Sequence, residues 1–362
     1  MRHKPAKELV KLCASLDALL RCAKNRAMST HPVTLAQVAA AAGVSPSTVS
    51  RILNGTARVD ETKRLAVEAA IAQLNFQPNA MAQGLARGRT MTIGVLTQDI
   101  SSPFYNEILK GVEDGLSGTG FAPIFASGHW NAEEETQRLT MLARRPVDGL
   151  IVLTGAIPDD KLATFAERTP MVTMGHRVER DNVVCLQMDN EQAAYEATCH
   201  LLELGHTAIA HISGPPHMGD SAQRLAGYRR ALEERGIAFN PDLIVPGDFR
   251  DNTGVVAVAQ LLERRQSFTA LFAANDQMAI GARLAFYRRG IRVPEDVSLI
   301  GFDDLPAASF CTPPLTTVRQ PVYEIGFQSA TALMRLLRGE RCDPITLPLS
   351  VVVRESTQRQ RF

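Results

Sequence analysis

The sequence predicts a small all-α helix-turn-helix headpiece followed by a larger α/β domain that folds as two lobes. Residues 34–53 contain two short helical patterns on either side of a Gly-Val-Ser turn, which is the spacing of a helix-turn-helix. From Met91 onward, apolar runs of strand length alternate with amphipathic segments of helix length, which indicates parallel sheets covered by helices. That part of the chain is too long for one compact core, so we expect two lobes.

The composition excludes several other classes of protein. The 362-residue chain is 45% hydrophobic and 21% charged, as ordinary globular proteins are, so neither a disordered nor a fibrous protein is expected. No apolar run approaches the roughly 20 residues that a membrane helix needs, so we expect no membrane partner. The six cysteines show no C-x-x-C spacing, which argues against a zinc site or a disulfide framework and favours a reduced, cytoplasmic protein.

Charge is distributed unevenly along the chain. Residues 1–92 contain 13 Lys and Arg against 5 Asp and Glu, whereas the remainder contains 26 against 33. A basic first part joined to a mildly acidic body indicates an anionic partner for the first part alone, with a solvated basic face as the alternative.

The first 27 residues have a pattern of their own. Leucines recur at helical spacing among lysines and arginines, which is typical of an amphipathic helix, and no cleavage site of a signal peptide follows. Because Met28 comes directly afterwards, we interpret residues 1–27 as an N-terminal extension outside the functional protein, in preference to a membrane or partner helix.

The helix-turn-helix pattern begins at Thr34, which can cap a first helix that Gly43 ends. Ser45 can cap a second helix, and Pro46 occupies its first position, where a missing N–H costs nothing. A third helix is expected from Asp60 to Leu74, beneath the first two. Its buried positions are expected to be Leu65, Ala69 and Ile71.

The second helix is polar on all sides but one, more so than a merely structural helical hairpin requires. Hydroxyl groups near a helix N-terminus suit phosphate oxygens, and Arg51 can bind guanine O6 and N7 in the major groove. We therefore predict double-stranded DNA as a partner. The residues predicted to contact it are Thr34, Ser45, Ser47, Thr48, Ser50, Arg51, Asn54 and, from the segment that follows the headpiece, Leu85.

That segment, residues 78–90, is predicted to be a hinge. Its helical pattern is too short to be stable alone, and Gly84 weakens it by about 1 kcal/mol relative to Ala. We therefore expect it to become ordered only on a partner. Leu85 beside Arg87 and Arg89 suits an apolar side chain that enters the minor groove, and a flexible linker with an incidental leucine is the alternative.

The body of the chain places ligand-binding side chains at one edge of its predicted sheets. Strands are expected at residues 91–97, 122–127, 148–153, 171–175, 183–188, 208–213, 243–246, 269–273, 297–302 and 348–353. The loops beyond their carboxyl ends, where ligands gather, carry hydrogen-bonding and aromatic side chains, a combination that binds sugars. We predict an effector site for a small sugar-like molecule at Phe104, Tyr105, His176, Asp220, Arg224, Phe249, Asn275, Asp276 and Asp303. As structural alternatives, Asp276 and Asp303 can cap helices and Phe249 can belong to the core.

The segments VTLAQVAAAAGVSPSTVSRILNG, PNAMAQGLARG and TIGVLTQDISSPFYNEILKGVED resemble the lactose-repressor/galactose-repressor family of bacterial transcriptional regulators. The resemblance runs from about Val33 to Glu355. It implies a helix-turn-helix DNA-binding domain over residues 28–77, a hinge over 78–90, and a two-lobed, periplasmic-binding-protein-like domain over 91–362 that binds the effector and dimerises. Residues 1–27 have no counterpart, and Gly84 stands where the family more often has serine.

The resemblance also implies a function. It suggests a cytoplasmic, nucleoid-associated homodimer that binds a palindromic operator and represses carbohydrate-utilisation genes under control of the effector. Asp220 would oppose phosphate or carboxylate effectors and favour neutral polyols. Effector contacts are implied for Phe104, Tyr105, Arg224, Phe249, Asn275, Asp276 and Asp303. Chain crossings between the lobes are implied near Met188–Asn190, at Thr317–Pro321, and either around Thr253 or in the C-terminal segment.

Three alternatives stay open. An enzyme is disfavoured because the H-E-x-x-H, G-x-S-x-G and phosphate-loop motifs are absent, so no catalytic residue, metal ligand or cofactor is predicted. A sugar-binding protein without DNA function is disfavoured by the helix-turn-helix. Within the regulator class, the effector can instead be a purine or another non-sugar metabolite, acting as inducer or as corepressor.

Overall fold

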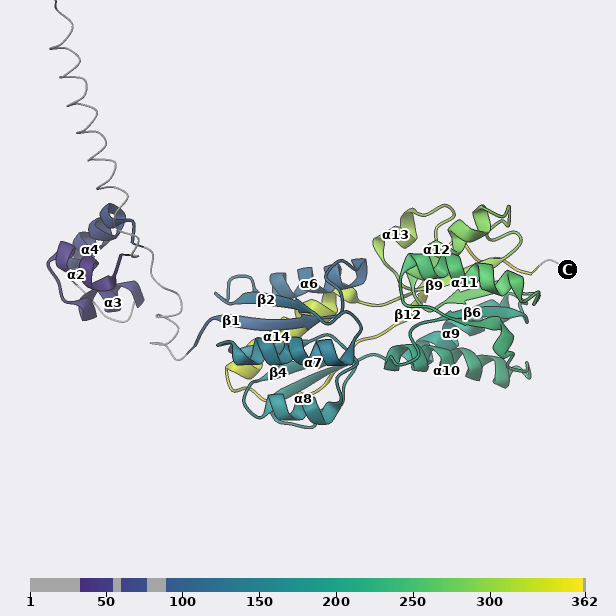
Figure 1. Ribbon diagram of the computed structural model, residues 1–362, viewed down its shortest axis with the longest axis horizontal. Coiled ribbons are helices and arrows are strands. Elements are labelled where there is room, and N and C mark those ends of the chain that lie inside the picture. Colours follow the sequence, from purple (N-terminus) through teal and green to yellow (C-terminus); the bar gives the residue numbers. More distant parts are fainter. Residues whose placement is uncertain (1–32, 55–59, 77–88, 361–362) are drawn as a thin grey trace, which may run out of the picture. The chain divides into compact units, whose positions relative to one another are not determined.

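The computed structural model describes residues 33–54, 60–76 and 89–360. The chain divides into two compact units, residues 1–88 and 89–362 (Figure 1). The predicted N-terminal extension (1–27), Gly84 and Leu85 lie outside the described residues.

The described part of the first unit consists of the helices α2 (Leu35–Ala42), α3 (Pro46–Asn54) and α4 (Glu61–Leu74). The Thr34 hydroxyl accepts a hydrogen bond from the Gln37 N–H, and the Gln37 side chain accepts one from the Thr34 N–H, so α2 begins with a complete capping box. Gly43 ends α2 with a φ of 66°. The predicted helix-turn-helix is thereby confirmed. Its core is formed by Val38, Ala39, Val49, Val67, Ala70 and Phe76.

The predicted inward face of α4 is wrong at Leu65 and Ala69, whereas the third predicted residue, Ile71, does pack against the headpiece core. Leu65 is 54% exposed and Ala69 is exposed, whereas Val67 and Ala70 are buried. Both sets of residues have helical spacing, so periodicity alone cannot choose between the two faces. The packing of α4 against α2 makes the choice.

The second unit contains two lobes, each built on a six-stranded sheet in its described residues. Lobe 1 contains β1 (Thr92–Thr97), β2 (Ala122–Ser127), β3 (Gly149–Val152), β4 (Met171–Met174), β5 (Val183–Gln187) and β11 (Ile345–Thr346), in the spatial order β11-β5-β4-β3-β1-β2. Its helices are α6 (Pro103–Leu116), α7 (Ala132–Arg144), α8 (Asp159–Ala166) and α14 (Val322–Leu337).

Lobe 2 repeats this architecture. It contains β6 (Ile209–Ser213), β7 (Ile244–Pro246), β8 (Ala270–Ala273), β9 (Ser298–Asp303), β10 (Thr316–Arg319) and β12 (Ser350–Val352), in the spatial order β12-β10-β9-β8-β6-β7. Its helices are α9 (Asn190–Glu203), α10 (Gly219–Glu234), the 3-10 helix η1 (Pro241–Leu243), α11 (Asp251–Glu263), α12 (Asp276–Tyr287) and α13 (Pro306–Phe310). Among the strand pairs described, β10 and β12 are antiparallel and the others are parallel.

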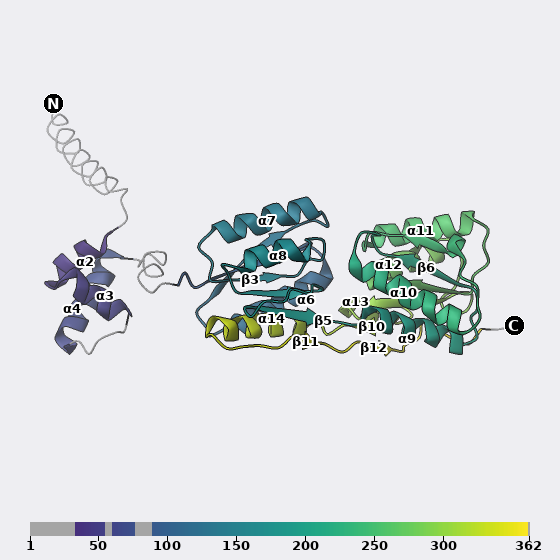
Figure 2. The same cartoon turned by 90° about the horizontal axis from the view of Figure 1, so that it is seen from below.

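Helices cover both faces of each sheet (Figure 2). In lobe 1, alternation along β1 turns Ile93 and Val95 toward α6 and α14, and Leu96 toward α7 and α8. In lobe 2, α11 and α12 pack on one face and α9 and α10 on the other. The predicted two-lobed α/β architecture is confirmed.

Within residues 89–360, the chain crosses between the lobes at 188–189, 320–321 and 347–349. The third crossing is therefore the C-terminal one, because Thr253 lies inside α11. The prediction of a simple crossing at Thr317–Pro321 missed β10, which pairs with β9 and β12. The two threonines of β10 are fully buried, and their polar groups are hydrogen-bonded inside the lobe, which allows a polar strand in a core. The two-residue strand β11 was also missed.

Candidate functional site

The side chains predicted to contact DNA lie on α3 or cap a helix. The Ser45 hydroxyl accepts the Thr48 N–H at 3.2 Å and lies 2.8 Å from the hydroxyls of both Ser47 and Thr48, so it caps α3. Arg51 is exposed, while Val49 of the same helix is buried in the headpiece core. Ser50 is half-buried, and the side chain of Asn54, at the end of α3, lies outside the described residues. The exposed surface of α3 thus offers hydroxyls at its N-terminus and a guanidinium toward its end.

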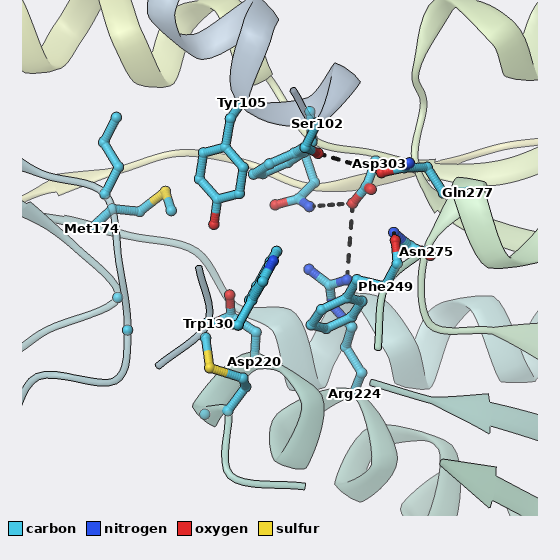
Figure 3. A pocket seen from close by; sticks show the side chains of 17 residues that line it. Ser102, Tyr105, Trp130, Met174, Asp220, Arg224, Phe249, Asn275, Gln277 and Asp303 are labelled. Atoms are coloured by element: carbon cyan, nitrogen blue, oxygen red, sulfur yellow. Dashed lines mark hydrogen bonds and ion pairs between the residues drawn. The ribbon is translucent and has the colours of Figure 1, made fainter. Parts of the chain in front are cut away.

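A cavity of about 670 Å³, counting the part open to solvent, lies between the two lobes (Figure 3). The lining includes seven residues predicted from the sequence, namely Phe104, Tyr105, Asp220, Arg224, Phe249, Asn275 and Asp303. The structure therefore brings together side chains that are up to two hundred residues apart in the chain.

Arg224 is the cation at the lobe 2 end of this cavity, and it is buried. Its Nε donates to the Asn190 side chain at 2.9 Å, and its Nη1 donates to the Ala274 carbonyl at 2.5 Å. The guanidinium also lies 3.8 Å from the centroid of the Phe302 ring. These contacts fix the orientation of the guanidinium, since few of its donors are left to move.

Asp303 faces Arg224 across 3.9 Å and accepts a hydrogen bond of 2.7 Å from the Gln320 side chain. Burial raises the pKa of Asp303 to about 7, and Arg224 and Gln320 oppose that rise by stabilising the charged form. The carboxyl group therefore gains and loses its proton near neutral pH.

Trp130, the single tryptophan of the sequence, forms an aromatic wall that the sequence prediction missed. Its ring centroid lies 5.9 Å from that of Tyr105 in lobe 1 and 5.5 Å from that of Phe249 in lobe 2. Trp130 and His129 before it both have positive φ angles, 62° and 51°. Such angles are costly for bulky residues, and here the Trp130 N–H is held by the Gln98 side chain at 2.9 Å.

Two contacts join the lobes at the rim of the cavity. The Ser102 hydroxyl of lobe 1 donates to the Gln277 side chain of lobe 2 at 3.3 Å. His217 of lobe 2 donates to the Trp130 carbonyl at 3.3 Å. Besides these two hydrogen bonds, the Arg250 guanidinium of lobe 2 lies 3.9 Å from the Asp99 carboxylate of lobe 1, and the rings of Trp130 and Phe249 meet across the lobes.

His176 and Asp276, also predicted to bind the effector, do not line this cavity, although His176 lines an adjoining one. His176 is buried between the Asp159 carboxylate at 2.8 Å and the Thr154 carbonyl at 2.5 Å. Asp276 is fully buried and accepts hydrogen bonds from the Thr317 hydroxyl and the Leu305 N–H. Both side chains are thus occupied by structural partners. The cap alternative is wrong for Asp276, because Asn275 caps α12 and Asp276 binds partners outside that helix.

Besides Trp130, several lining residues went unpredicted because neutral amides, small residues and methionines carry no distinctive sequence signal. They are Ser102, Leu153, Gly155, Met174, Gly175, Met218, Gly219, Gln277 and Gln320. Gln277 directly follows the predicted Asn275-Asp276 pair, so helical register could have drawn attention to it. In the part of the chain that the structure describes, no group of three His, Cys, Asp or Glu side chains could hold a metal ion, and no helix is long and apolar enough to cross a bilayer.

A helix-turn-helix unit with an exposed polar second helix, followed by a two-lobed unit with a cavity of polar and aromatic lining between its lobes, defines a ligand-controlled DNA-binding regulator. Comparison with known proteins agrees. Residues 34–79 match the model of the bacterial regulatory proteins of the lacI family, and residues 198–357 match that of the periplasmic binding protein-like domain.

Individual relatives cover almost the whole chain. The HTH-type transcriptional regulator GalR of Escherichia coli (strain K12) is 37% identical, over 86% of this chain and 92% of its own length. The HTH-type transcriptional repressor PurR of Proteus mirabilis (strain HI4320) is 36% identical, over 87% and 93%. The solved structure of the lac repressor dimer bound to operator and the anti-inducer ONPF has a TM-score of 0.80 at 31% identity, covering 91% of this chain and 100% of that one.

The chain belongs to the lacI family of bacterial regulatory proteins. It is accordingly a DNA-binding transcriptional regulator, and its relatives are regulators, not enzymes.

Proposed function

We propose that this regulator is a repressor of carbohydrate-utilisation genes whose operator affinity is controlled by a neutral sugar bound between the lobes. The observation that carries the proposal is the composition of the cavity. Aromatic rings of Tyr105, Trp130 and Phe249 stand beside Arg224 and two carboxyl groups, Asp220 and Asp303. Apolar faces of a sugar ring stack on such walls, and its hydroxyls pair with the charged and amide groups.

The charge of the cavity supports a neutral effector over an anionic one. Arg224 is the lining residue with a permanent positive charge, and Asp303 and Asn190 already engage it. An added phosphate or carboxylate would meet Asp220 and the ionised form of Asp303, and like charges at close range are repulsive.

For DNA binding, we assign base reading to Arg51 and phosphate contacts to Thr34, Ser45, Ser47, Thr48, Ser50 and Asn54. Leu85 of the hinge is assigned to the minor groove on the sequence pattern alone. A single helix-turn-helix covers a short half-site, so two copies on a palindrome are needed for affinity and for spacing.

We assign homodimerisation to residues 91–362. Lobe 2 exposes large apolar side chains at Leu284, Tyr287 and Phe310, and Tyr287 is 80% exposed. Such side chains gathered on one lobe favour a second copy of the chain as occupant, in keeping with the dimer of the lac repressor structure.

The remaining assignments follow from this function. Residues 28–77 bind DNA, 78–90 form the hinge, and 1–27 are dispensable for operator binding. The protein has no enzymatic activity and acts in the bacterial cytoplasm at the nucleoid.

A nucleobase effector is the second candidate. The edge-to-face pair of Phe104 and Tyr105, with centroids 5.1 Å apart, and the Trp130 ring offer flat aromatic surface on which a purine would also stack. The PurR relative makes this candidate specific enough to test.

Both candidates are tested by a ligand screen that uses the fluorescence of Trp130. Neutral sugars, sugar phosphates, purine bases and nucleosides are titrated into the full-length protein. The proposal predicts that at least one neutral sugar changes the emission saturably and that its phosphate ester binds more weakly. Saturable binding of purines alone would replace the sugar assignment with the nucleobase one.

A further inference from the structure

A second cavity adjoins the one between the lobes. It measures about 1080 Å³, counting the part open to solvent. Its lining includes Gln187, the crossing segment that follows β5, and Gln223 of α10. The two cavities share four lining residues, namely Met174, Gly175, Gly219 and Asp220. The two cavities therefore adjoin at these residues.

Two glycines line the junction of the two cavities. An added Cβ at Gly219 would meet no heavy atom within 4 Å, and one at Gly175 would meet only the Asp220 carboxylate, at 4.0 Å. Glycines packed tightly elsewhere in this protein behave differently: a Cβ at Gly227, on the same helix as Gly219, would meet the Glu191 carbonyl at 2.1 Å. The space beside Gly175 and Gly219, here called the passage, is thus open. No packed neighbour requires glycine at either position, although the φ of 76° at Gly175 favours one there.

The second cavity has polar walls with free hydrogen-bonding capacity. In the described part of the chain, the side-chain amides of Gln187 and Gln223 make no hydrogen bond. Gln223 lies one helical turn after Gly219, so both face the same side of α10. Asp220 lines both cavities and can accept hydrogen bonds from groups on either side of the junction.

We propose that the effector is a disaccharide, with one ring on the aromatic walls of the first cavity and the second ring past Gly175 and Gly219 in the second cavity. This inference rests on the proposed sugar effector and specifies that the sugar has two rings. Free amides and a shared carboxylate match the hydroxyls of a second sugar ring. A single ring would leave the second cavity filled only with water.

The test compares sugars of two lengths in four forms of the full-length protein: the wild type, Gly219→Leu, Gly219→Ala and Gln223→Ala. Glucose and galactose, and the disaccharides cellobiose, maltose, lactose and melibiose, are titrated calorimetrically and by the Trp130 emission. Gly219 has an ordinary φ, so a side chain fits its backbone without strain. Gly219→Leu fills the passage, and Gly219→Ala is the matched control that removes the glycine but leaves the passage open.

In the wild type, one disaccharide should bind at least about tenfold more tightly than either of its component sugars. Gly219→Leu should remove that advantage by weakening the disaccharide more than the monosaccharides, whereas Gly219→Ala should retain it. Gln223→Ala should weaken the disaccharide selectively. These results support the second ring site.

The inference is overturned if monosaccharides bind as tightly as disaccharides, or if Gly219→Leu weakens both lengths equally. That outcome leaves the sugar effector standing. Binding of no sugar of either length instead overturns the proposed function itself, so the two failures are distinguishable. A nucleoside can also bind more tightly than its free base in the wild type but not in Gly219→Leu. That result would assign the second cavity to the ribose of a nucleoside instead of to a second sugar ring.

Discussion

Asp303 combines a carboxyl group, nearly complete burial and a buried cation 3.9 Å away. Its pKa is raised to about 7 by burial, so the folded apo protein carries a mixture of protonated and ionised forms at neutral pH. Sugar hydroxyls donate to the ionised form. Effector affinity should therefore be highest at pH values above the pKa of Asp303 and should fall as the pH drops below that pKa.

The expected change is about tenfold weaker effector binding at pH 6 than at pH 8, since each pH unit below the pKa removes most of the ionised form. Isothermal titration of the screened sugar at these pH values measures it. Asp303→Asn keeps the shape of the side chain without the titration, so its weaker affinity should be flat over the same range. An unchanged slope in Asp303→Asn would assign the pH dependence to another group.

Trp130 belongs to the cavity's aromatic wall and has a positive φ of 62°, a conformation that persists where the surroundings enforce it. Trp130→Ala should weaken sugar binding about tenfold, through loss of the apolar surface on which a ring stacks. Trp130→Phe, the matched control, should recover most of the affinity. Calorimetry is the required measurement because both variants lose the fluorophore. Equal affinity of Trp130→Ala and the wild type would remove this side chain from the site.

Arg51 is exposed on α3 and predicted to read a guanine. Arg51→Ala should weaken binding to a selected operator by about 1–3 kcal/mol while leaving binding to random duplex DNA nearly unchanged. Arg51→Lys retains the charge but cannot donate two parallel hydrogen bonds to a guanine, so it should also lose most of the preference for the operator over random DNA. Gel-shift titrations on both DNAs provide the comparison. Equal losses on the two DNAs would make Arg51 a phosphate contact.

Sequence reasoning placed seven residues in the cavity because polar and aromatic side chains at strand ends have a distinctive pattern. It could not place Trp130, since nothing local in Gly128–Asn131 reveals consecutive left-handed residues held by Gln98, thirty-two positions away. It also could not separate Asp276 from Asp303. Their chemistry is the same, and only the tertiary position of Thr317 shows that Asp276 faces away from the cavity.

At the scale of elements, the lobes depend on helices that approach each other through glycines. On α14, a Cβ at Gly326 would lie 1.8 Å from the Ile108 carbonyl of α6, and one at Gly111 of α6 would lie 2.1 Å from the Tyr323 carbonyl of α14. Backbone atoms cannot swing aside as a flexible side chain can. Any side chain at these positions must therefore push the two helices apart.

Gly326→Ala should accordingly lower the free energy of unfolding of lobe 1 by about 1–3 kcal/mol, the usual cost of overpacking. Urea unfolding of the full-length protein, followed by circular dichroism and by the emission of Trp130 in lobe 1, measures it. Glu324→Ala on the same helix is the control and should change stability by less than about 0.5 kcal/mol, because its side chain is exposed. A neutral Gly326→Ala would show that α6 and α14 can separate without cost.

The elements themselves were largely predictable. Apolar runs with turn signals on both sides located ten strands, and capping residues such as Thr34 and Gly43 located the helix ends. Strand β10 and the buried face of α4 were mispredicted for the same reason, which is that their local sequence patterns are ambiguous. Contacts with residues distant in the sequence decide both: Thr317 of β10 donates to Asp276, and Val67 of α4 packs against α2.

At the scale of the whole molecule, the two lobes are joined by three chain crossings in the described residues and hold the cavity between them. A ligand that contacts both lobes, as Tyr105 and Trp130 on one side and Arg224 and Phe249 on the other permit, favours one lobe separation over others. In the proposed dimer, we expect that choice to change the spacing of the two headpieces. Sugar and operator are then coupled, and each alters the affinity of the other by the same factor.

The most direct measurement is the operator affinity of the full-length protein with and without the sugar that saturates the Trp130 signal. A duplex is first selected from random DNA with the purified protein, labelled, and titrated by fluorescence anisotropy at fixed salt. Control of the operator by a sugar in the cleft predicts an affinity change of about 5- to 150-fold. An operator affinity that stays the same at a sugar concentration saturating the cavity would contradict it.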